Sequence, residues 1–188
     1  LIHFPAKGNF DSIKNLKKML ISFPEMAGID LASDVSTKAI YIWKNGIKLS
    51  FKKKRLKKFV AVIDFGIKRN ILNILSSYGY EVVVFPVDFS INEILSLNPN
   101  GIFLSNGPGD PHATFKKYSE NLSVIKNFEK PVFGICLGHQ ILSLIYNAFT
   151  EKMHHGHRGA NHPIKNEKNS KVEITVQNHG FVVSKKSF

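Results

Sequence analysis

The sequence predicts an α/β fold built on a doubly wound, mostly parallel sheet. From Phe59 onward, short apolar runs of strand length alternate with segments whose apolar residues recur at helical spacing. Short apolar strands joined through helices indicate a parallel sheet covered on both faces. Two glycine-rich stretches, at residues 105–111 and 134–140, directly follow such runs. Ligands bind beyond the carboxyl ends of the strands in sheets of this kind, so these stretches are the first candidates for a functional site.

Residues 1–50 have a different pattern, and we expect them to be the remnant of a small N-terminal domain. Apolar residues recur at helical spacing between residues 13 and 23, and Pro24 ends the predicted helix. Residues 39–51 alternate around Asn45-Gly46, which indicates a hairpin. The basic segment 51–58 is predicted to be a linker, with a nuclear-localisation or polyanion-binding patch as the alternative. Residues 59–188 then form the main domain, which we expect to be incomplete at its C-terminus.

The main domain contains four predicted strands, which cover residues 59–64, 80–86, 101–105 and 130–136. Helices are predicted at residues 67–79, 90–98, 114–128 and 139–149. Ser90 is the expected N-cap of the second helix, and Gly79 ends the first. The last helix is expected to face the core with Ile141, Leu142, Ile145 and Phe149.

Net charge and composition limit which classes of partner, such as nucleic acids or membranes, the chain is expected to have. The chain carries 26 Lys and Arg against 14 Asp and Glu, a formal net charge of +12. This excess fits nucleic-acid binding, but no helix-turn-helix, zinc-finger or aromatic RNA-binding motif accompanies it. We therefore favour lysines solvated on the surface and expect no nucleic-acid partner. No apolar run approaches the ~20 residues that span a bilayer, so no membrane partner is expected either.

The single cysteine and the N-terminus suggest where the chain works. One cysteine cannot form an intramolecular disulfide, and a reducing, cytoplasmic setting is the simpler expectation. The N-terminus lacks the basic head and long apolar stretch of a signal peptide. It also lacks an initiator Met, from which we expect the chain to be a fragment or a trimmed product.

That cysteine, Cys136, stands in the stretch "GICLGHQ" with glycines two places before and after it. A nucleophile at a tight strand-to-helix turn needs small neighbours at these positions, because larger side chains would collide. The N-terminus of the following helix is expected to favour the thiolate, and the N–H of Leu137 to bind an oxyanion. The alternative is that Cys136 is a small buried apolar residue, as most lone cysteines are.

The second glycine-rich stretch is "SNGPGDP", residues 105–111. Gly107 and Gly109 leave the backbone uncovered, and two prolines stiffen it, so that a backbone N–H can approach a ligand oxygen closely. An ordinary connecting turn has the same dipeptides, and on its own this stretch is a weak signal.

Together, "GICLGHQ", "SNGPGDP", "GHRGANHP" (156–163) and "QNHGF" (177–181) resemble the class I glutamine amidotransferases. The narrower resemblance is to the small, glutamine-hydrolysing subunits of carbamoyl phosphate synthase. "DFGIKRNIL" (64–72) and "FPEMAGIDLASDVST" (23–37) add to it, so that the resemblance covers essentially the whole chain.

The resemblance implies a role for each matching residue. Cys136 attacks the side-chain amide of L-glutamine to give a glutamyl thioester and ammonia. The backbone N–H groups of Gly107 and Leu137 form the oxyanion hole. The residues implied to line the glutamine pocket are Gly107, Gly109, Leu137, Gln140, Asn178, Gly180 and Phe181.

The resemblance also implies partners and cofactors. Ammonia passes to a separate large subunit, which uses ATP and Mg to make carbamoyl phosphate for arginine and pyrimidine biosynthesis. No cofactor is expected in this subunit. His154, His155, His157 and His162 invite a metal interpretation, but no second cysteine or clear acidic ligand accompanies them, and no metal is expected.

The family pattern completes the catalytic triad with a histidine and a glutamate well after "QNHGF", and residues 182–188 contain no such motif. We therefore expect the chain alone to hydrolyse glutamine poorly, since the thiol lacks its base. Three hypotheses stay open. They are an amidotransferase subunit whose remaining segment is encoded elsewhere, an inactive truncated relative with at most a binding role, and a basic nucleic-acid-binding module.

Overall fold

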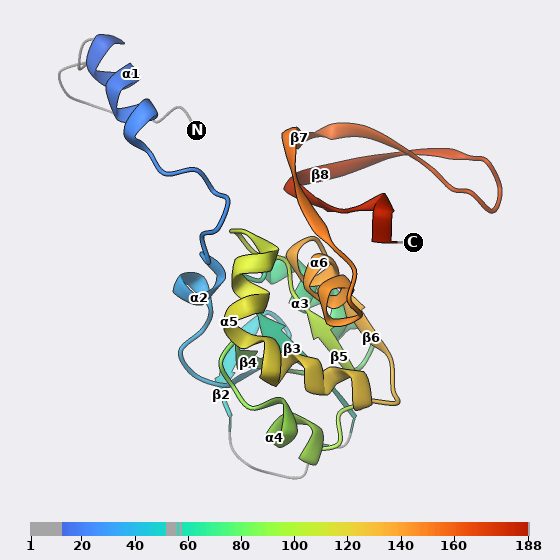
Figure 1. The fold of residues 1–188 in the computed structure, drawn as a ribbon. Coiled ribbons are helices and arrows are strands. Elements are labelled where there is room, and N and C mark those ends of the chain that lie inside the picture. The colour runs from blue at the N-terminus through green and yellow to red at the C-terminus, as the bar shows by residue number, and fades with distance from the viewer. Residues whose placement is uncertain (1–12, 52–55, 57, 188) are drawn as a thin grey trace.

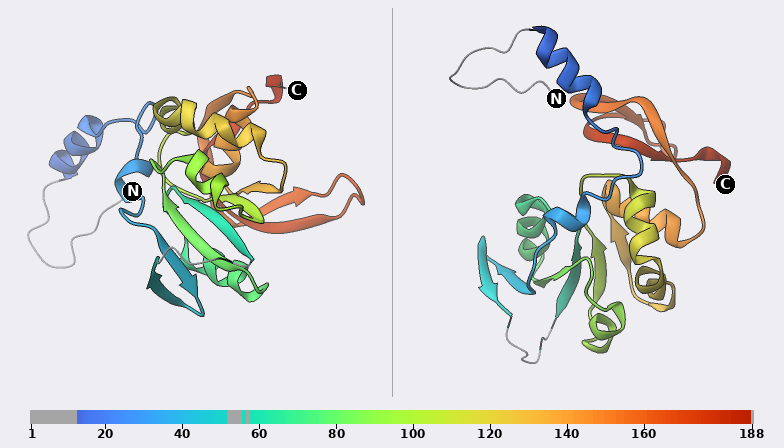
Figure 2. Two further views of the ribbon diagram at one scale, coloured as in Figure 1. Left: turned by 90° about the horizontal axis from the view of Figure 1, so that it is seen from below. Right: turned by 60° about the vertical axis from the view of Figure 1, so that its left-hand side comes forward.

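A mixed sheet with helices on both faces forms the body of the protein, and a long hairpin projects from it (Figures 1 and 2). The computed structural model describes residues 13–51, 56 and 58–187. Two hydrophobic clusters, one on each face of the six-stranded sheet, make up the core. The predicted α/β class with a mostly parallel, doubly wound sheet is confirmed.

The sheet has the strand order β2-β1-β4-β3-β5-β6. Its central pairs, β3 with β4, β3 with β5 and β5 with β6, are parallel, whereas β1 pairs antiparallel with both β2 and β4. The strands are β1 (Tyr41–Lys44), β2 (Ile47–Ser50), β3 (Phe59–Asp64), β4 (Glu81–Pro86), β5 (Gly101–Leu104) and β6 (Val132–Gly134). The parallel strands β3, β5 and β6 therefore end at one edge, as the predicted site requires.

Helices follow each parallel strand and confirm the predicted alternation. Their bounds are α3 (Arg69–Ser77), α4 (Ile91–Ser96), α5 (Pro111–Ser123) with the short 3-10 helix η1 (Val124–Asn127), and α6 (Leu137–Ile145). Ser90 caps α4 as predicted, because its hydroxyl accepts the N–H of Glu93 at 3.3 Å. Gly79 follows α3 with a φ of +78°, a left-handed conformation that glycine adopts without strain.

The helices are divided between the two faces of the sheet. Leu72 of α3 packs with the strand residues Val62 and Val84 in one cluster. The other cluster joins strand side chains such as Ile63 to apolar residues of α4, α5, η1 and α6. Completely buried β-branched and aromatic residues line β3 and β4 on both sides, as expected for strands in the interior of a parallel sheet.

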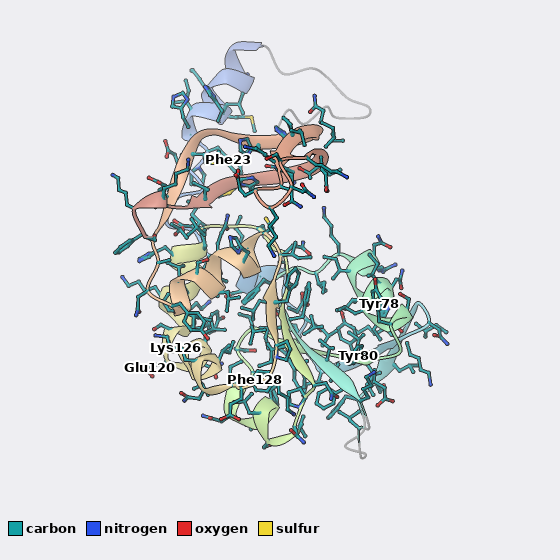
Figure 3. All side chains as sticks on the ribbon, turned by 90° about the vertical axis from the view of Figure 1, so that its right-hand side faces the viewer. Phe23, Tyr78, Tyr80, Glu120, Lys126 and Phe128 are labelled. Carbon is teal, nitrogen blue, oxygen red and sulfur yellow. The ribbon has the colours of Figure 1, made fainter. Side chains whose placement is uncertain are left out.

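The segment before β3 contains α1 (Ile13–Ser22), α2 (Ala32–Val35) and the β1–β2 hairpin. The predicted helix before Pro24 is present as α1, and Phe23 directly after it is 77% exposed (Figure 3). The predicted hairpin is also present, with positive φ at Asn45 (49°) and Gly46 (80°). Because β1 pairs with β4, this hairpin extends the main sheet. The division into domains at residue 50 stays a prediction, and residues 52–55 and 57 of the predicted linker lie outside the described residues.

The projecting hairpin consists of β7 (Thr150–Lys165) and β8 (Val172–Val183), which pair antiparallel as a separate two-stranded sheet. Its ladder has two irregularities, between Lys152 and His157 and between Gly159 and His162. Both sequence motifs "GHRGANHP" and "QNHGF" lie in it, opposite each other. The hairpin thus brings the two motifs together next to α6.

The fourth predicted strand and the helix that follows it, β6 and α6, were each predicted wrongly in one detail. Strand β6, at one edge of the sheet, contains only three residues, and Phe133 within it is 61% exposed, with its ring tilted against that of Phe103. Helix α6 ends at Ile145, and Asn147 has a φ of 64°. Phe149 lies beyond this turn and is 65% exposed instead of facing the core, whereas Ile141 and Ile145 are buried as predicted.

Candidate functional site

Cys136 occupies the turn between β6 and α6. Its φ of 53° and ψ of −110° lie outside the regions that residues with a Cβ prefer, a conformation that costs about 1–3 kcal/mol. The side chain is partly exposed at the first position before the helix. The strained strand-to-helix turn predicted from "GICLG" is therefore present in the structure.

The two glycines of this turn allow two backbone segments to touch. A Cβ on Gly138 would lie 2.1 Å from the carbonyl oxygen of Leu104 in β5, and one on Gly134 would lie 2.5 Å from the carbonyl carbon of Gly138. Backbone atoms cannot move aside as the end of a side chain can. Any larger residue at either position would therefore push the elbow out of shape.

Gly107 and Leu137, the two predicted oxyanion-hole residues, are neighbours. A Cβ on Gly107 would lie 2.8 Å from Cδ2 of Leu137 and 2.1 Å from the carbonyl oxygen of Phe65. Leu137 is buried, and its backbone N–H lies within hydrogen-bonding reach of the Cys136 sulfur. Loop 105–111 and the elbow thus meet at the carboxyl ends of β3, β5 and β6.

The end of β8 lies against the elbow. The thiol of Cys136 donates to the backbone carbonyl of Asn178 at 3.7 Å, and the side-chain amide of buried Gln140 donates to the carbonyl of Phe181 at 2.6 Å. Phe181 is itself buried. The structure therefore brings together four of the residues that the sequence pointed to, although the members of each pair are 42 and 41 positions apart.

Gly109 is placed differently from the others, because it packs against the N-terminal segment. A Cβ there would lie 2.8 Å from the backbone nitrogen of Leu31, and its φ is +99°. The neighbouring Asp110 donates its backbone N–H to the carbonyl of Ile29 at 2.9 Å, and its carboxylate accepts the N–H of Gly28 at 2.8 Å. Segment 28–31 thus holds the glycine-rich loop from its outer side.

Burial and two nearby groups change the pKa of Cys136 in opposite directions. Burial raises the pKa of Cys136, and the N–H of Leu137 and the charge of Lys68 act in the opposite direction without cancelling it. The N–H of Leu137, at the start of α6, favours the thiolate as expected, but burial has the larger effect on the pKa of Cys136. A thiol in this state needs a base to react at neutral pH.

The histidines of the hairpin contact one another instead of the thiol. His179 directs Nδ1 at the carbonyl of Phe181 (2.8 Å), and its Nε2 lies 3.1 Å from both His157 Nδ1 and Gln177 Oε1. Because a carbonyl only accepts, His179 donates from Nδ1, and both of its nitrogens are engaged within the hairpin. In the described part of the chain, no group of three or more His, Cys, Asp or Glu side chains could hold a metal ion.

A polar cavity of about 310 Å³ lies elsewhere, between residues 33–38, residues 87–88 and the middle of α5. Ser33, Thr37, Lys38 and Lys117 are among its lining residues, and none of the residues predicted for glutamine binding is. The candidate site at Cys136 lies outside this cavity and is assembled from backbone groups of the elbow, loop 105–111 and β8.

Comparison with known proteins agrees with this arrangement. Residues 61–188, which include the whole elbow and its surrounding loops, match the family described as glutamine amidotransferase class-I. The chain belongs to the class I glutamine amidotransferase family. Among solved structures, a glutamine amidotransferase from Thermotoga maritima has a TM-score of 0.52 and 17% identity, over 68% of this chain and 62% of that chain. This likeness concerns the fold alone.

The curated relatives of this amidotransferase chain are carbamoyl phosphate synthase small chains. The chain is 43% identical over 194 residues to that of Bartonella bacilliformis, which covers 100% of this chain and 47% of the relative. It is 45% identical over 191 residues to that of Bradyrhizobium diazoefficiens, with 100% and 48% covered. These matches confirm the narrower resemblance predicted from the motifs. The chain spans about half the length of the curated relatives it matches.

Sequence reasoning missed three residues that shape this amidotransferase site. Asp110 anchors loop 105–111, Lys68 acts on the thiol through its charge, and Arg158 lies on β7 directly opposite Asn178. All three were inside quoted motifs, and Asp110 also precedes a proline in a helix-capping pattern, but only the three-dimensional arrangement distinguishes them. None of the helices in the described residues is long and apolar enough to cross a membrane.

Proposed function

We propose that this chain is the glutamine-binding and nucleophile-bearing part of a carbamoyl phosphate synthase small subunit, with Cys136 as the nucleophile. The observation that carries the proposal is the elbow at Cys136, strained and flanked by Gly134 and Gly138 at backbone contact distance. A surface turn kept in a conformation that costs free energy is typical of a functional position. An inert buried cysteine would need neither the strain nor the two glycines.

In the proposed reaction, the sulfur of Cys136 attacks the side-chain carbonyl carbon of L-glutamine. A C–S bond forms, the oxygen takes up negative charge, and the N–H groups of Gly107 and Leu137 stabilise that charge. The C–N bond then breaks, ammonia leaves with the proton that a base supplies, and a glutamyl thioester stays on Cys136. Water hydrolyses the thioester to glutamate and frees the thiol.

The proposed pocket uses the loop and strand that surround the elbow. Gly109, Gln140, Asn178, Gly180 and Phe181 are assigned to substrate binding together with the two oxyanion-hole residues. The contact of Cys136 with the carbonyl of Asn178 and that of Gln140 with Phe181 support this assignment, because they hold β8 beside the nucleophile.

The proposed partner and its cofactors are based on the relatives, which are carbamoyl phosphate synthase small chains. We propose that ammonia passes to a large subunit that uses ATP and Mg, and that this chain itself carries no cofactor. The raised pKa of Cys136 fits a site that depends on a base beyond its own helix N-terminus. We keep the expectation that the 188-residue chain alone turns over glutamine poorly, and that it acts in the cytoplasm.

Protection of Cys136 by substrate tests the proposal. The rate at which iodoacetamide alkylates Cys136 is measured by mass spectrometry with and without L-glutamine. We expect saturating L-glutamine to slow alkylation, whereas D-glutamine and L-asparagine leave the rate unchanged. Alkylation at the same rate with and without L-glutamine, in protein whose circular dichroism shows a folded state, would refute a glutamine site at this cysteine.

A further inference from the structure

Arg158 places a guanidinium beside two of the proposed glutamine-binding residues. In the β7–β8 ladder it stands directly opposite Asn178. A Cβ built on Gly180 would lie 3.3 Å from its Nη2, and one built on Gly156 would lie 2.9 Å from its Nη1. The guanidinium therefore lies beside two positions that carry no side chain: Gly156 of β7, and Gly180 of β8, the strand that reaches the nucleophile.

One nitrogen of the Arg158 guanidinium is held by a hydrogen bond, and the group can still donate to a ligand from its other nitrogens. Nη1 donates to the backbone carbonyl of His155 at 2.5 Å, which orients the planar group. Within the described residues, Arg158 forms no ion pair with a carboxylate, although Lys117, Lys152 and Lys165 each form one. An oriented arginine with a free edge is suited to bidentate binding of a planar carboxylate.

The distance between this group and the nucleophile suits an amino-acid substrate. Asn178, whose carbonyl accepts the Cys136 thiol, and Gly180, beside the guanidinium, are two residues apart, about 7 Å along a strand. In extended glutamine, four C–C bonds separate the amide carbon from the carboxylate carbon, a span of about 5 Å. A substrate whose amide lies at Cys136 can thus extend along β8 towards Arg158.

We propose that Arg158 binds the α-carboxylate of the amino-acid substrate and so makes the site selective for free glutamine over simple amides. This rests on the proposed function, because it takes Cys136 as the reacting end. Arg158 is a specificity-determining residue in this account, whereas the nucleophile and the oxyanion hole carry the chemistry. The test therefore compares reagents that differ only in the carboxylate.

The chloromethyl-ketone analogue of L-glutamine and the same ketone without its carboxylate are the two probes. Each alkylates Cys136 when its sulfur displaces chloride: a C–S bond forms, the C–Cl bond breaks, and the thiol proton goes to solvent. Second-order labelling rates are measured for the unchanged chain, Arg158→Gln, Arg158→Lys and Lys165→Gln. Lys165→Gln is the matched control, since it removes one positive charge from the same strand. Circular dichroism checks that each variant is folded.

We expect Arg158→Gln to slow labelling by the carboxylate-bearing probe at least tenfold and to leave the other probe unchanged. Arg158→Lys should retain part of the preference, and Lys165→Gln all of it. An Arg158→Gln chain that keeps the full preference would overturn the role of Arg158 and leave the glutamine site standing. Equal rates for both probes on the unchanged chain would refute the glutamine site itself, and carboxylate binding with it. If Arg158→Gln does not fold, Arg158→Lys takes its place: a reduced or lost preference supports carboxylate binding by the guanidinium, and the full preference overturns it.

Discussion

The side-chain amide of Gln140 donates to the backbone carbonyl of Phe181 at 2.6 Å, across 41 positions of sequence. Gln140 lies in the first turn of the elbow helix and Phe181 at the end of the "QNHGF" motif. Both residues are buried, so this bond ties the nucleophile's helix to the strand that carries Asn178. The bond makes the position of β8 depend on the same helix that presents Cys136.

Replacing Gln140 should therefore abolish the effect of L-glutamine on Cys136 while lowering the free energy of unfolding only modestly. Gln140→Ala leaves the carbonyl of Phe181 without its partner, which costs about 1–3 kcal/mol for a buried group. We expect a loss of this size in urea unfolding, and the loss of protection of Cys136 by L-glutamine. Ser143→Ala is the control, because the Ser143 hydroxyl donates to the carbonyl of His139 within the same helix at 3.0 Å. Protection that survives in Gln140→Ala would contradict the link.

The close approach at Gly138 predicts a strong effect of a single methyl group. In Gly138→Ala, the Cβ would overlap the carbonyl oxygen of Leu104, and the elbow can accept it only through a shift of α6. We expect a loss of at least about 3 kcal/mol in the free energy of unfolding. Gly79→Ala is the control, since Gly79 has a φ of +78° but no atom near its Cβ position, and about 1–2 kcal/mol is expected there. Equal losses would argue against a sterically tight elbow.

Asp110 predicts how firmly segment 28–31 holds the glycine-rich loop. Its two carboxylate oxygens accept the N–H of Gly28 and the N–H of His112, each at 2.8 Å, the second as the N-cap of α5. Asp110→Ala removes both bonds and should cost about 2 kcal/mol, measured by urea unfolding. Asp110→Asn keeps one acceptor for the cap and should cost roughly half as much. An Asp110→Asn variant as stable as the unchanged chain would mean that the bond to Gly28 contributes nothing.

The raised pKa of Cys136 predicts the pH dependence of its alkylation. A raised pKa means that the folded protein keeps the thiol proton to higher pH. The reactive thiolate therefore forms at a higher pH than in an unstructured peptide, where the cysteine pKa is about 8.5. The midpoint of the iodoacetamide rate against pH should lie above that of a cysteine peptide. Lys68→Gln should raise it further, because the charge of Lys68 favours the thiolate.

Lys126→Gln is the control for this profile, since Lys126 is exposed on η1, on the flank of the body and away from the hairpin (Figure 3). It should leave the midpoint unchanged. A midpoint below that of the peptide would show that the helix N-terminus outweighs burial, as the sequence pattern alone suggested.

The local parts of the fold were predictable because short-range patterns determine them. The run 59–64 is strand β3 to the residue, Ser90 caps its helix, and Asn45-Gly46 forms the hairpin turn. The elbow was predictable for the same reason, since glycines two places either side of Cys136 record a steric requirement within five residues.

The long-range parts were not predictable from patterns. No local pattern ties Gln140 to Phe181 or Asp110 to Gly28, because such contacts depend on how distant segments pack. Only the family resemblance placed Gln140 and Phe181 in one pocket. The long hairpin 150–183 was also not foreseen: the alternation of Val172, Ile174 and Val176 with polar residues was overlooked, and the histidines and glycines of β7 show no such alternation. Phe149 was assigned to the helix by its spacing, but the turn at Asn147 carries it to the surface.

The central claim is that Cys136 is a nucleophile at a glutamine site, and one labelling measurement tests it most directly. The purified chain is treated with the chloromethyl-ketone analogue of L-glutamine, and the adduct is counted by intact mass and located by peptide mapping. We predict one adduct per chain, on Cys136, absent in Cys136→Ser and suppressed by L-glutamine. A folded chain that takes up no adduct, or one whose labelling L-glutamine does not slow, would contradict the account.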